Sequence, residues 1–347
     1  MTLTALDRNV WPGVYRWLAF MKWLALFMIV GALSSALSFA RDGSDCVTAP
    51  IVLPLLGGEG DAPLIPVTVN GKRAAMYVSP SFDSIYVRNA QGITFPDGGE
   101  PTTVLMNGTY REQASRSRID KLVLDETALK NVDVIRLDTP STQVVDGRPV
   151  VGVLGRTALS SLAILVDIPE RQFAYLDFSN KEVCKGAIDG FLGKDSHSAE
   201  MEDDFTVHIR IGTRKKRVRF DPDLTYTTFP SFWMSSLKDN LQVLETQKKF
   251  THYDRFMSVG QAAQVRNLFM GGVPIRDEKV LFQDEVDIGN LGLPFFADKV
   301  ILWSLGRNRL YFVQPAHIKP MPKGQSLHFF ATHSGSVAIR DGAGTVQ

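Results

Sequence analysis

The stretch LIPVTVNGKRAAMYVSPSFDSIYV, residues 64–87, decides the fold because its pattern occurs a second time. The second copy is TVHIRIGTRKKRVRFDPDLTYTTF, residues 206–229. In each copy an alternating apolar strand reaches a glycine, returns along a second short strand and enters a turn with a central proline. These turns are Ser79-Pro80-Ser81 and Asp221-Pro222-Asp223. Apolar residues at every second position predict a β-hairpin with one buried face.

Two further pairs of segments repeat in the same order, 119–137 with 265–282 and 152–178 with 289–313. The last pair shares a Leu-Gly step, Leu154-Gly155 and Leu291-Gly292, before a short apolar turn of expected helix. Position 79 thus matches position 221, and position 155 matches position 292, so the offset between the copies is nearly constant and close to the length of a domain. A repeat of this length predicts duplication of a whole lobe rather than a short solenoid repeat.

These matched segments resemble the lobe of a retropepsin-type aspartic protease. In that family a strand–Asp-Thr-Gly–strand element precedes an apolar–apolar–Gly step and a short helix. Two such lobes in one chain resemble a pepsin-like protease, and the resemblance covers about residues 62–315. It implies a mainly β protein with two duplicated retropepsin-like lobes in a bilobal acid-protease fold. An apolar strand within residues 50–62 is expected to join a sheet beneath both lobes.

The expected organisation has six parts. They are a signal peptide or membrane anchor (1–40), an N-terminal strand and linker (41–61), a first lobe (62–184), a linker (185–203), a second lobe (204–315) and a C-terminal tail (316–347), whose last residues are expected to be poorly ordered. An insert in the second lobe, residues 230–262, has apolar residues at roughly helical spacing and is expected to be rich in helix. These apolar residues are Phe232, Trp233, Leu237, Leu241 and Leu244.

The catalytic motif of the family is altered in both copies. An aspartic protease needs two facing carboxylates, one from each lobe, which share one proton and hold the attacking water. Ser79 stands where the resemblance places the first acid, whereas Asp221 keeps the second. Pro222 and Asp223 replace the family's Thr and Gly, and proline removes a backbone donor and fixes φ. A hydroxyl cannot hold the second charge, so the sequence predicts a catalytically inactive protein that binds a peptide or protein partner between its lobes.

The predicted site contains Ser79, Ser81, Asp83, Tyr110, Asp221 and Asp223, with Asp221 as the single catalytic candidate. Tyr110 falls where the resemblance places a flap over the cleft, and an exposed turn tyrosine is the other interpretation. One alternative function is an active aspartic endopeptidase that pairs Asp221 with Asp83 or Asp223. Asp223 lies in the same lobe as Asp221, so that pair would not straddle a substrate. The other alternative is a structural or assembly protein of the cell envelope that binds its neighbours through its surfaces.

Composition and the spacing of residues argue against several other classes of protein and kinds of site. With 38 basic and 37 acidic residues the formal net charge is +1, which argues against a general nucleic-acid binder. The basic run 214–217 is expected on the second hairpin turn, either as a solvated turn or as a contact to an anionic surface. No phosphate-cradling glycine loop and no metal-ligand spacing occurs near Asp221, so neither a cofactor nor a metal is expected.

The N-terminal segment has the features of an export signal. Lys22 precedes an apolar run, residues 23–37, and the small residues Ser38 and Ala40 fit the positions before a signal-peptidase cut. The alternative is an uncleaved anchor from about residue 17 to residue 40, which is long enough to span a bilayer. Either interpretation predicts an exported protein of the periplasm or cell envelope, anchored in the inner membrane in the second case.

Two cysteines, Cys46 and Cys184, flank the first lobe. Export permits a disulfide between them, which would close a loop that contains the whole of that lobe. Two unpaired thiols are the alternative. Two cysteines do not suffice for a structural zinc site made of cysteines alone.

Overall fold

A computed structural model gives the three-dimensional structure. It describes residues 46–313 apart from 59–60, 107–109, 161, 180–181, 185, 194, 203, 252–256 and 277, and also residues 328–331 and 337–340. Strands dominate these residues, and the few helices are short. The predicted mainly β class is therefore confirmed.

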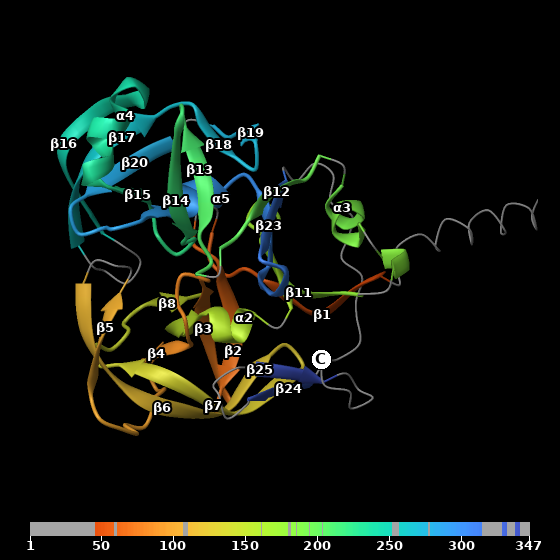
Figure 1. Ribbon diagram of the computed structural model, residues 1–347. Coiled ribbons are helices and arrows are strands. Elements are labelled where there is room, and N and C mark those ends of the chain that lie inside the picture. Colours follow the sequence, from red (N-terminus) through yellow and green to blue (C-terminus); the bar gives the residue numbers. More distant parts are fainter. Residues whose placement is uncertain are drawn as a thin grey trace, which may run out of the picture. The chain divides into compact units, whose positions relative to one another are not determined.

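The first copy of the repeat lies in an eight-stranded sheet (Figure 1). Its main path runs β2 (Leu64–Val69), β3 (Lys72–Val78), β9 (Arg148–Leu154), β4 (Tyr86–Arg88), β7 (Thr127–Leu137), β6 (Tyr110–Leu124) and β5 (Thr102–Met106), and β8 (Val144–Val145) pairs with β9. The predicted hairpin is β2 and β3, which turn at Asn70 and Gly71 with φ of 48° and 83°. β2 also pairs with β6, where Val69 faces Leu122. This pairing closes six strands into a barrel.

The second copy lies in a nine-stranded sheet. The order is β16 (Leu241–Thr251), β17 (Met257–Val265), β20 (Glu278–Gln283), β15 (Thr227–Pro230), β21 (Gly289–Leu291), β14 (Arg214–Phe220), β13 (Val207–Ile211), β18 (Leu268–Met270) and β19 (Val273–Pro274). β13 pairs with β18, where Ile211 faces Leu268. In the first sheet the single strand β6 closes the barrel. In the second sheet the corresponding stretch is divided into β17 and β18, and this sheet forms a half-barrel.

The two sheets contain the same pairings in the same order. β3 runs parallel to β9 and β4 runs parallel to β7. In the second sheet β14 runs parallel to β21 and β15 runs parallel to β20. The antiparallel contact of Tyr86 with Val153 corresponds to that of Thr228 with Asn290. The offsets between these positions are the same ones that relate Ser79 to Asp221 and Gly155 to Gly292 in the sequence.

A six-stranded sheet joins the two halves. It consists of β1 (Val47–Pro54), β11 (Gln172–Phe178), β10 (Ala163–Asp167), β22 (Val300–Ser304), β23 (Arg309–Val313) and β12 (His197–Glu200). The halves meet where β10 pairs with β22, and Leu165 faces Leu302 at the centre of that ladder. β1 pairs with β11. The strand expected within residues 50–62 therefore begins earlier, at Val47, and joins a sheet shared by both halves.

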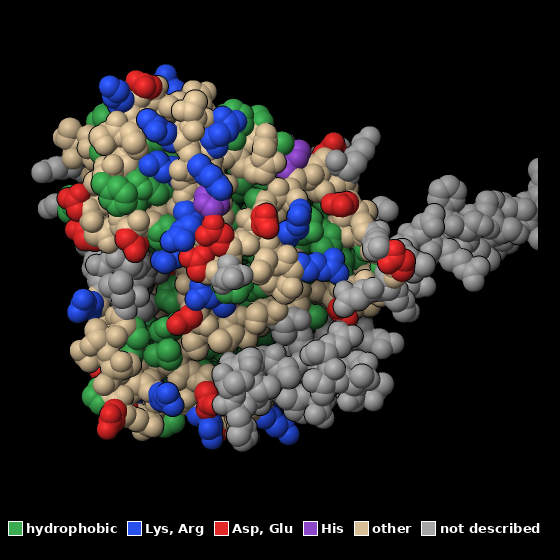
Figure 2. Space-filling view, viewed as in Figure 1, with side chains coloured by type: hydrophobic (Ala, Val, Ile, Leu, Met, Phe, Trp, Pro, Cys, Tyr) green, Lys and Arg blue, Asp and Glu red, His purple; other side chains and the backbone are tan. Residues whose placement is uncertain are grey.

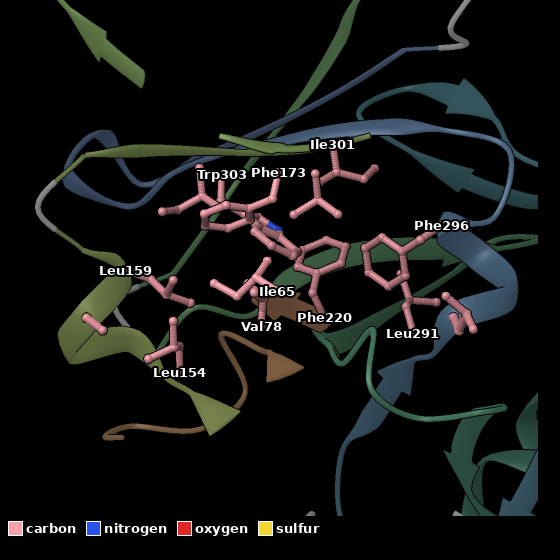
Figure 3. Packing of buried hydrophobic residues seen from close by; sticks show 14 of the residues in the cluster. Ile65, Val78, Leu154, Leu159, Phe173, Phe220, Leu291, Phe296, Ile301 and Trp303 are labelled. Atoms are coloured by element: carbon pink, nitrogen blue, oxygen red, sulfur yellow. The ribbon is translucent and has the colours of Figure 1, made fainter. Parts of the chain in front are cut away.

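The core packs this sheet against the two hairpins. In Figure 3 the side chains of Phe173, Ile301 and Trp303 point from β11 and β22 toward Ile65, Val78 and Phe220. All six of these side chains are at most 2% exposed. Burying a side chain of this size contributes roughly 1.5–3 kcal/mol. Val78 and Phe220 are the last residues before the two turns, so the shared core anchors both turns.

Two expectations about the second half are wrong, the helix-rich insert and the basic hairpin turn. The insert 230–262 contains only short helical turns, η3 (Ser231–Trp233), α4 (Met234–Leu237) and η4 (Lys238–Asn240), before the strands β16 and β17. The basic run 214–217 begins β14 rather than forming the turn. The expected linker 185–203 contains α3 (Ala187–Leu192) and β12, which completes the six-stranded sheet. For the insert and for the basic run, backbone pairing with a neighbouring strand prevails over a local sequence pattern.

The two ends of the chain are described only in part. In the tail, β24 (His328–Ala331) pairs with β25 (Val337–Arg340), whereas its last residues, 341–347, lie outside the described residues. The segment expected to be a signal peptide or anchor, residues 1–40, lies outside them as well. Among the residues that the structure does describe, no helix is both long and apolar enough to cross a membrane. Cys46 and Cys184 are both disulfide-bonded.

Candidate functional site

The two proline-containing turns leave equivalent strands and are held in equivalent ways. The Ser79 amide donates to the Leu154 carbonyl at 3.1 Å, and the Asp221 amide donates to the Leu291 carbonyl at 2.9 Å. Both carbonyls belong to the Leu-Gly steps recognised in the sequence. The hydrogen bonds fix each turn to the parallel strand beside it, β9 in the first half and β21 in the second.

The glycine of each Leu-Gly step allows a close approach of two backbones. After Gly155 the amide of Arg156 donates to the Phe82 carbonyl at 2.8 Å, and after Gly292 the amide of Leu293 donates to the Leu224 carbonyl at 2.7 Å. Short helices follow, α2 (Arg156–Leu159) and α5 (Leu293–Phe296). These hydrogen bonds hold the residues that follow each turn. Ser79 and Asp221 are therefore held in place by backbone hydrogen bonds at the start of the turn and beyond its end.

The structure brings the side chains of the two turns together. The Ser79 hydroxyl donates to Asp221 Oδ1 at 3.0 Å, and the Ser81 hydroxyl donates to the same oxygen at 2.7 Å. The two hydroxyl oxygens are themselves 2.8 Å apart. Ser79 is fully buried and Asp221 is 1% exposed, whereas Ser81 keeps part of its surface accessible. One carboxylate thus accepts hydrogen bonds from two serines of the other half of the chain.

Asp223 adds a second carboxyl group to this cluster. Burial raises its pKa well above the usual range of an aspartate, and the charge and hydrogen bonding of Asp221 raise that pKa further, while a hydrogen bond with Ser79 lowers it. Its Oδ1 is buried without a hydrogen-bond partner among the described residues. Two carboxyl groups in one buried site cannot easily both ionise. Asp223 therefore retains a proton at pH values where an ordinary aspartate is charged.

Asp83 does not join the cluster, and the side chain of Tyr110 lies outside the described residues. Asp83 is exposed, and its Oδ1 accepts a hydrogen bond from the Tyr86 hydroxyl at 2.8 Å. Tyr110 is the first residue of β6, next to the hairpin connection 107–109, and its side chain lies outside what the structure describes. The structure thus places four of the six predicted residues together, namely Ser79, Ser81, Asp221 and Asp223.

The arrangement limits the chemistry of this cluster. Between the halves, a carboxylate faces hydroxyl groups, and a hydroxyl cannot share a proton with it as a second carboxyl group would. The only acid beside Asp221 in the cluster comes from its own turn. Among the described residues, no three His, Cys, Asp or Glu side chains are grouped to hold a metal ion.

Sequence reasoning did not foresee the two backbone acceptors, Leu154 and Leu291, that hold the turns. Their signal was present in the repeated Leu-Gly step, but a carbonyl partner cannot be read from a side-chain pattern. No protein-family model matches the chain, and no curated protein matches it either. The fold and the cluster are therefore the basis for a function.

Proposed function

We propose that this protein is an exported, non-catalytic relative of pepsin-like aspartic proteases that binds an extended peptide or a protein segment between two retropepsin-like lobes. The observation that carries the proposal is the hydrogen bond of 3.0 Å between Ser79 and Asp221. These residues occupy matching positions of the two copies, where the protease family has its two acids. A serine in one of these positions removes the partner that proton sharing requires.

The lobes retain features suited to holding an extended chain. Each half carries a long hairpin, β5 with β6 in the first and β16 with β17 in the second. Strand edges bind extended peptides through main-chain hydrogen bonds, and neighbouring pockets select side chains. Acidic and basic side chains are interspersed on the face in Figure 2, which favours a peptide or protein partner over a nucleic acid. Export to the periplasm or cell envelope is part of this proposal and depends on the segment 1–40.

Binding without cleavage is the expected result with unfolded protein. Fluorescently labelled casein peptides should bind saturably in an anisotropy titration, and their masses should be unchanged after prolonged incubation at pH 4 and pH 7. Ser81→Trp should weaken binding at least about tenfold, because Ser81 is the partly accessible hydroxyl of the cluster. Thr213→Trp, at the exposed turn between β13 and β14, is the matched control and should bind normally. Absence of saturable binding, or equal binding by both variants, would refute the proposed site.

A second candidate function is an aspartic peptidase that uses Asp221 with Asp223. It is favoured by the raised pKa of Asp223 beside Asp221, since a carboxyl pair that retains one proton supplies both an acid and a base. In this case the wild type should cleave casein at acid pH, and Asp221→Asn and Asp223→Asn should each lower the rate by at least about a hundredfold. A rate that survives both substitutions would exclude this chemistry and point to a contaminating protease.

A further inference from the structure

A cavity lies outside the Ser79–Asp221 cluster. It has a volume of about 360 Å³ and opens between the edge of the six-stranded sheet and the loops of the second half. Its walls come from β12, β19, β23 and the segment between α5 and β22. None of the residues that line it belongs to the two proline-containing turns. The volume is at the lower end of the range typical of small-molecule sites, about 300–1,000 Å³.

One wall of the cavity is apolar. Val273, Ile275 and Phe312 contribute side chains to it, and Phe312 is buried in the core at 4% exposure. A wall of this kind removes an apolar part of a ligand from water. It therefore favours a ligand with a hydrocarbon body over a fully polar one.

Two cations line the same cavity and share the carboxylate of Asp298, and Asp195 and His197 line the cavity as well. The Lys299 ammonium donates to Asp298 Oδ1 at 2.6 Å and to the Phe295 carbonyl at 3.0 Å. Arg276 lies 3.5 Å from the other oxygen of Asp298 and donates to the Pro294 carbonyl. The Lys299 side chain is only 9% exposed, so its charge is held in a largely dry position.

The unused hydrogen-bonding capacity of Lys299 and Arg276 is donor capacity. An ammonium group has three donors and a guanidinium has five, and neither has an acceptor. Two of the Lys299 donors are used by the contacts above, and Arg276 uses part of its set. Asp298 is already shared between the two cations. A ligand that completes the hydrogen bonds of Lys299 and Arg276 must bring acceptor atoms, and a carboxylate oxygen accepts strong, charge-assisted hydrogen bonds from such donors.

We infer that this cavity binds a small carboxylate with an apolar body, its carboxylate at Lys299 and Arg276 and its hydrocarbon against Val273, Ile275 and Phe312. A free carboxylic acid and the C-terminal residue of a peptide share this chemistry. The site is independent of the proposed peptide cleft, because its residues and its elements are different.

Calorimetric titration of the full chain at pH 7 tests the inference with two pairs of probes. The first pair is 4-methylpentanoate and its amide, and the second is N-acetyl-leucine and its amide. At least one carboxylate should bind saturably, and its amide should bind at least about tenfold more weakly, because the amide lacks the charge. Tighter binding of N-acetyl-leucine identifies a peptide C-terminus as the source, whereas tighter binding of 4-methylpentanoate identifies a free acid.

Variants test the assigned residues. Two variants should each weaken carboxylate binding about tenfold or more. Arg276→Gln changes a half-exposed side chain, and Lys299→Met replaces a buried cation by an apolar side chain of similar length. Lys279→Met is the matched control, since Lys279 is an exposed cation of β20 that does not line the cavity. Thermal melting shows whether Lys299→Met folds. If Lys299→Met does not fold, carboxylate binding by Arg276→Gln decides the outcome. Equal binding of acid and amide, no binding of either acid, or undiminished binding by Arg276→Gln overturns the inference.

Discussion

Replacing Gly155 by alanine is expected to lower the free energy of unfolding by about 3 kcal/mol or more. A Cβ atom at this position would lie 2.6 Å from the Phe82 carbonyl oxygen and closer still to that of Ser84. Both obstacles are backbone atoms, so no side chain can rotate away. The turn would have to separate from α2, and the hydrogen bond from Arg156 to Phe82 would be lost with it. Denaturant titration followed by fluorescence measures the loss as a lower midpoint.

Gly292→Ala is expected to cost a similar amount. Its Cβ would lie 2.8 Å from the Leu224 carbonyl oxygen and closer still to that of Tyr226. Gly190→Ala in α3 is the matched control, because a Cβ there meets no atom within 4 Å. It should leave stability unchanged or raise it by up to about 1 kcal/mol. If Gly155→Ala proves as stable as this control, the close backbone approach beside Ser79 is not rigid.

These same glycines explain why part of the fold could be predicted from the sequence. A Leu-Gly step and an alternating hairpin are short patterns whose physical causes, a close backbone approach and one buried sheet face, are local. Their recurrence at nearly constant offsets aligned Ser79 with Asp221, and the two side chains are hydrogen-bonded. The function of the pair is not encoded in this way, because the proposed binding would depend on a partner that is not part of the chain.

The insert after residue 230 shows where the local reasoning fails. Trp233, Leu237 and Leu241 are spaced four residues apart, which fits one face of a helix. Trp233 and Leu237 are indeed buried beside short helical turns, but β16 begins at Leu241 and pairs with β17. Leu244 is 43% exposed on that strand. The partner strand β17 lies beyond the apolar residues whose spacing predicted the helix, and the long-range pairing prevailed.

Buried charges are a second class of feature that the sequence does not reveal. Glu278 begins β20 and is followed by Lys279, and nothing in its neighbourhood in the sequence distinguishes it from an exposed acid. It is 3% exposed, and its Oε1 is buried without a hydrogen-bond partner among the described residues. Its burial results from the pairing of Glu278 with Val265 of β17, a contact between strands that only the fold determines.

Glu278→Gln is therefore expected to stabilise the protein above pH 7 and to change little near pH 4. Burial raises the pKa of Glu278 from 4.5 to about 7, although the positive charges of Arg276 and Lys299 oppose the rise. A carboxyl group with a raised pKa binds its proton more tightly in the folded state. Its ionisation thus costs stability as the pH rises from about 4.5 to about 7, by about 3 kcal/mol in total. Glutamine has nearly the same shape and does not ionise, so the variant avoids this loss.

Denaturant titrations of the wild type and the variant between pH 4 and pH 9 measure the difference. The difference in free energy of unfolding should grow through the window between the two pKa values and remain constant above it. Val280→Ala in the same strand is the control, because it removes buried apolar volume and should lower stability by about 2 kcal/mol at every pH. Taking the difference between variant and wild type removes the contributions of Asp167, Asp177 and Asp223, whose pKa values are also raised. A difference in unfolding free energy that does not vary with pH would mean that Glu278 is solvated or hydrogen-bonded. The start of β20 would then be more open than the 3% exposure of Glu278 indicates.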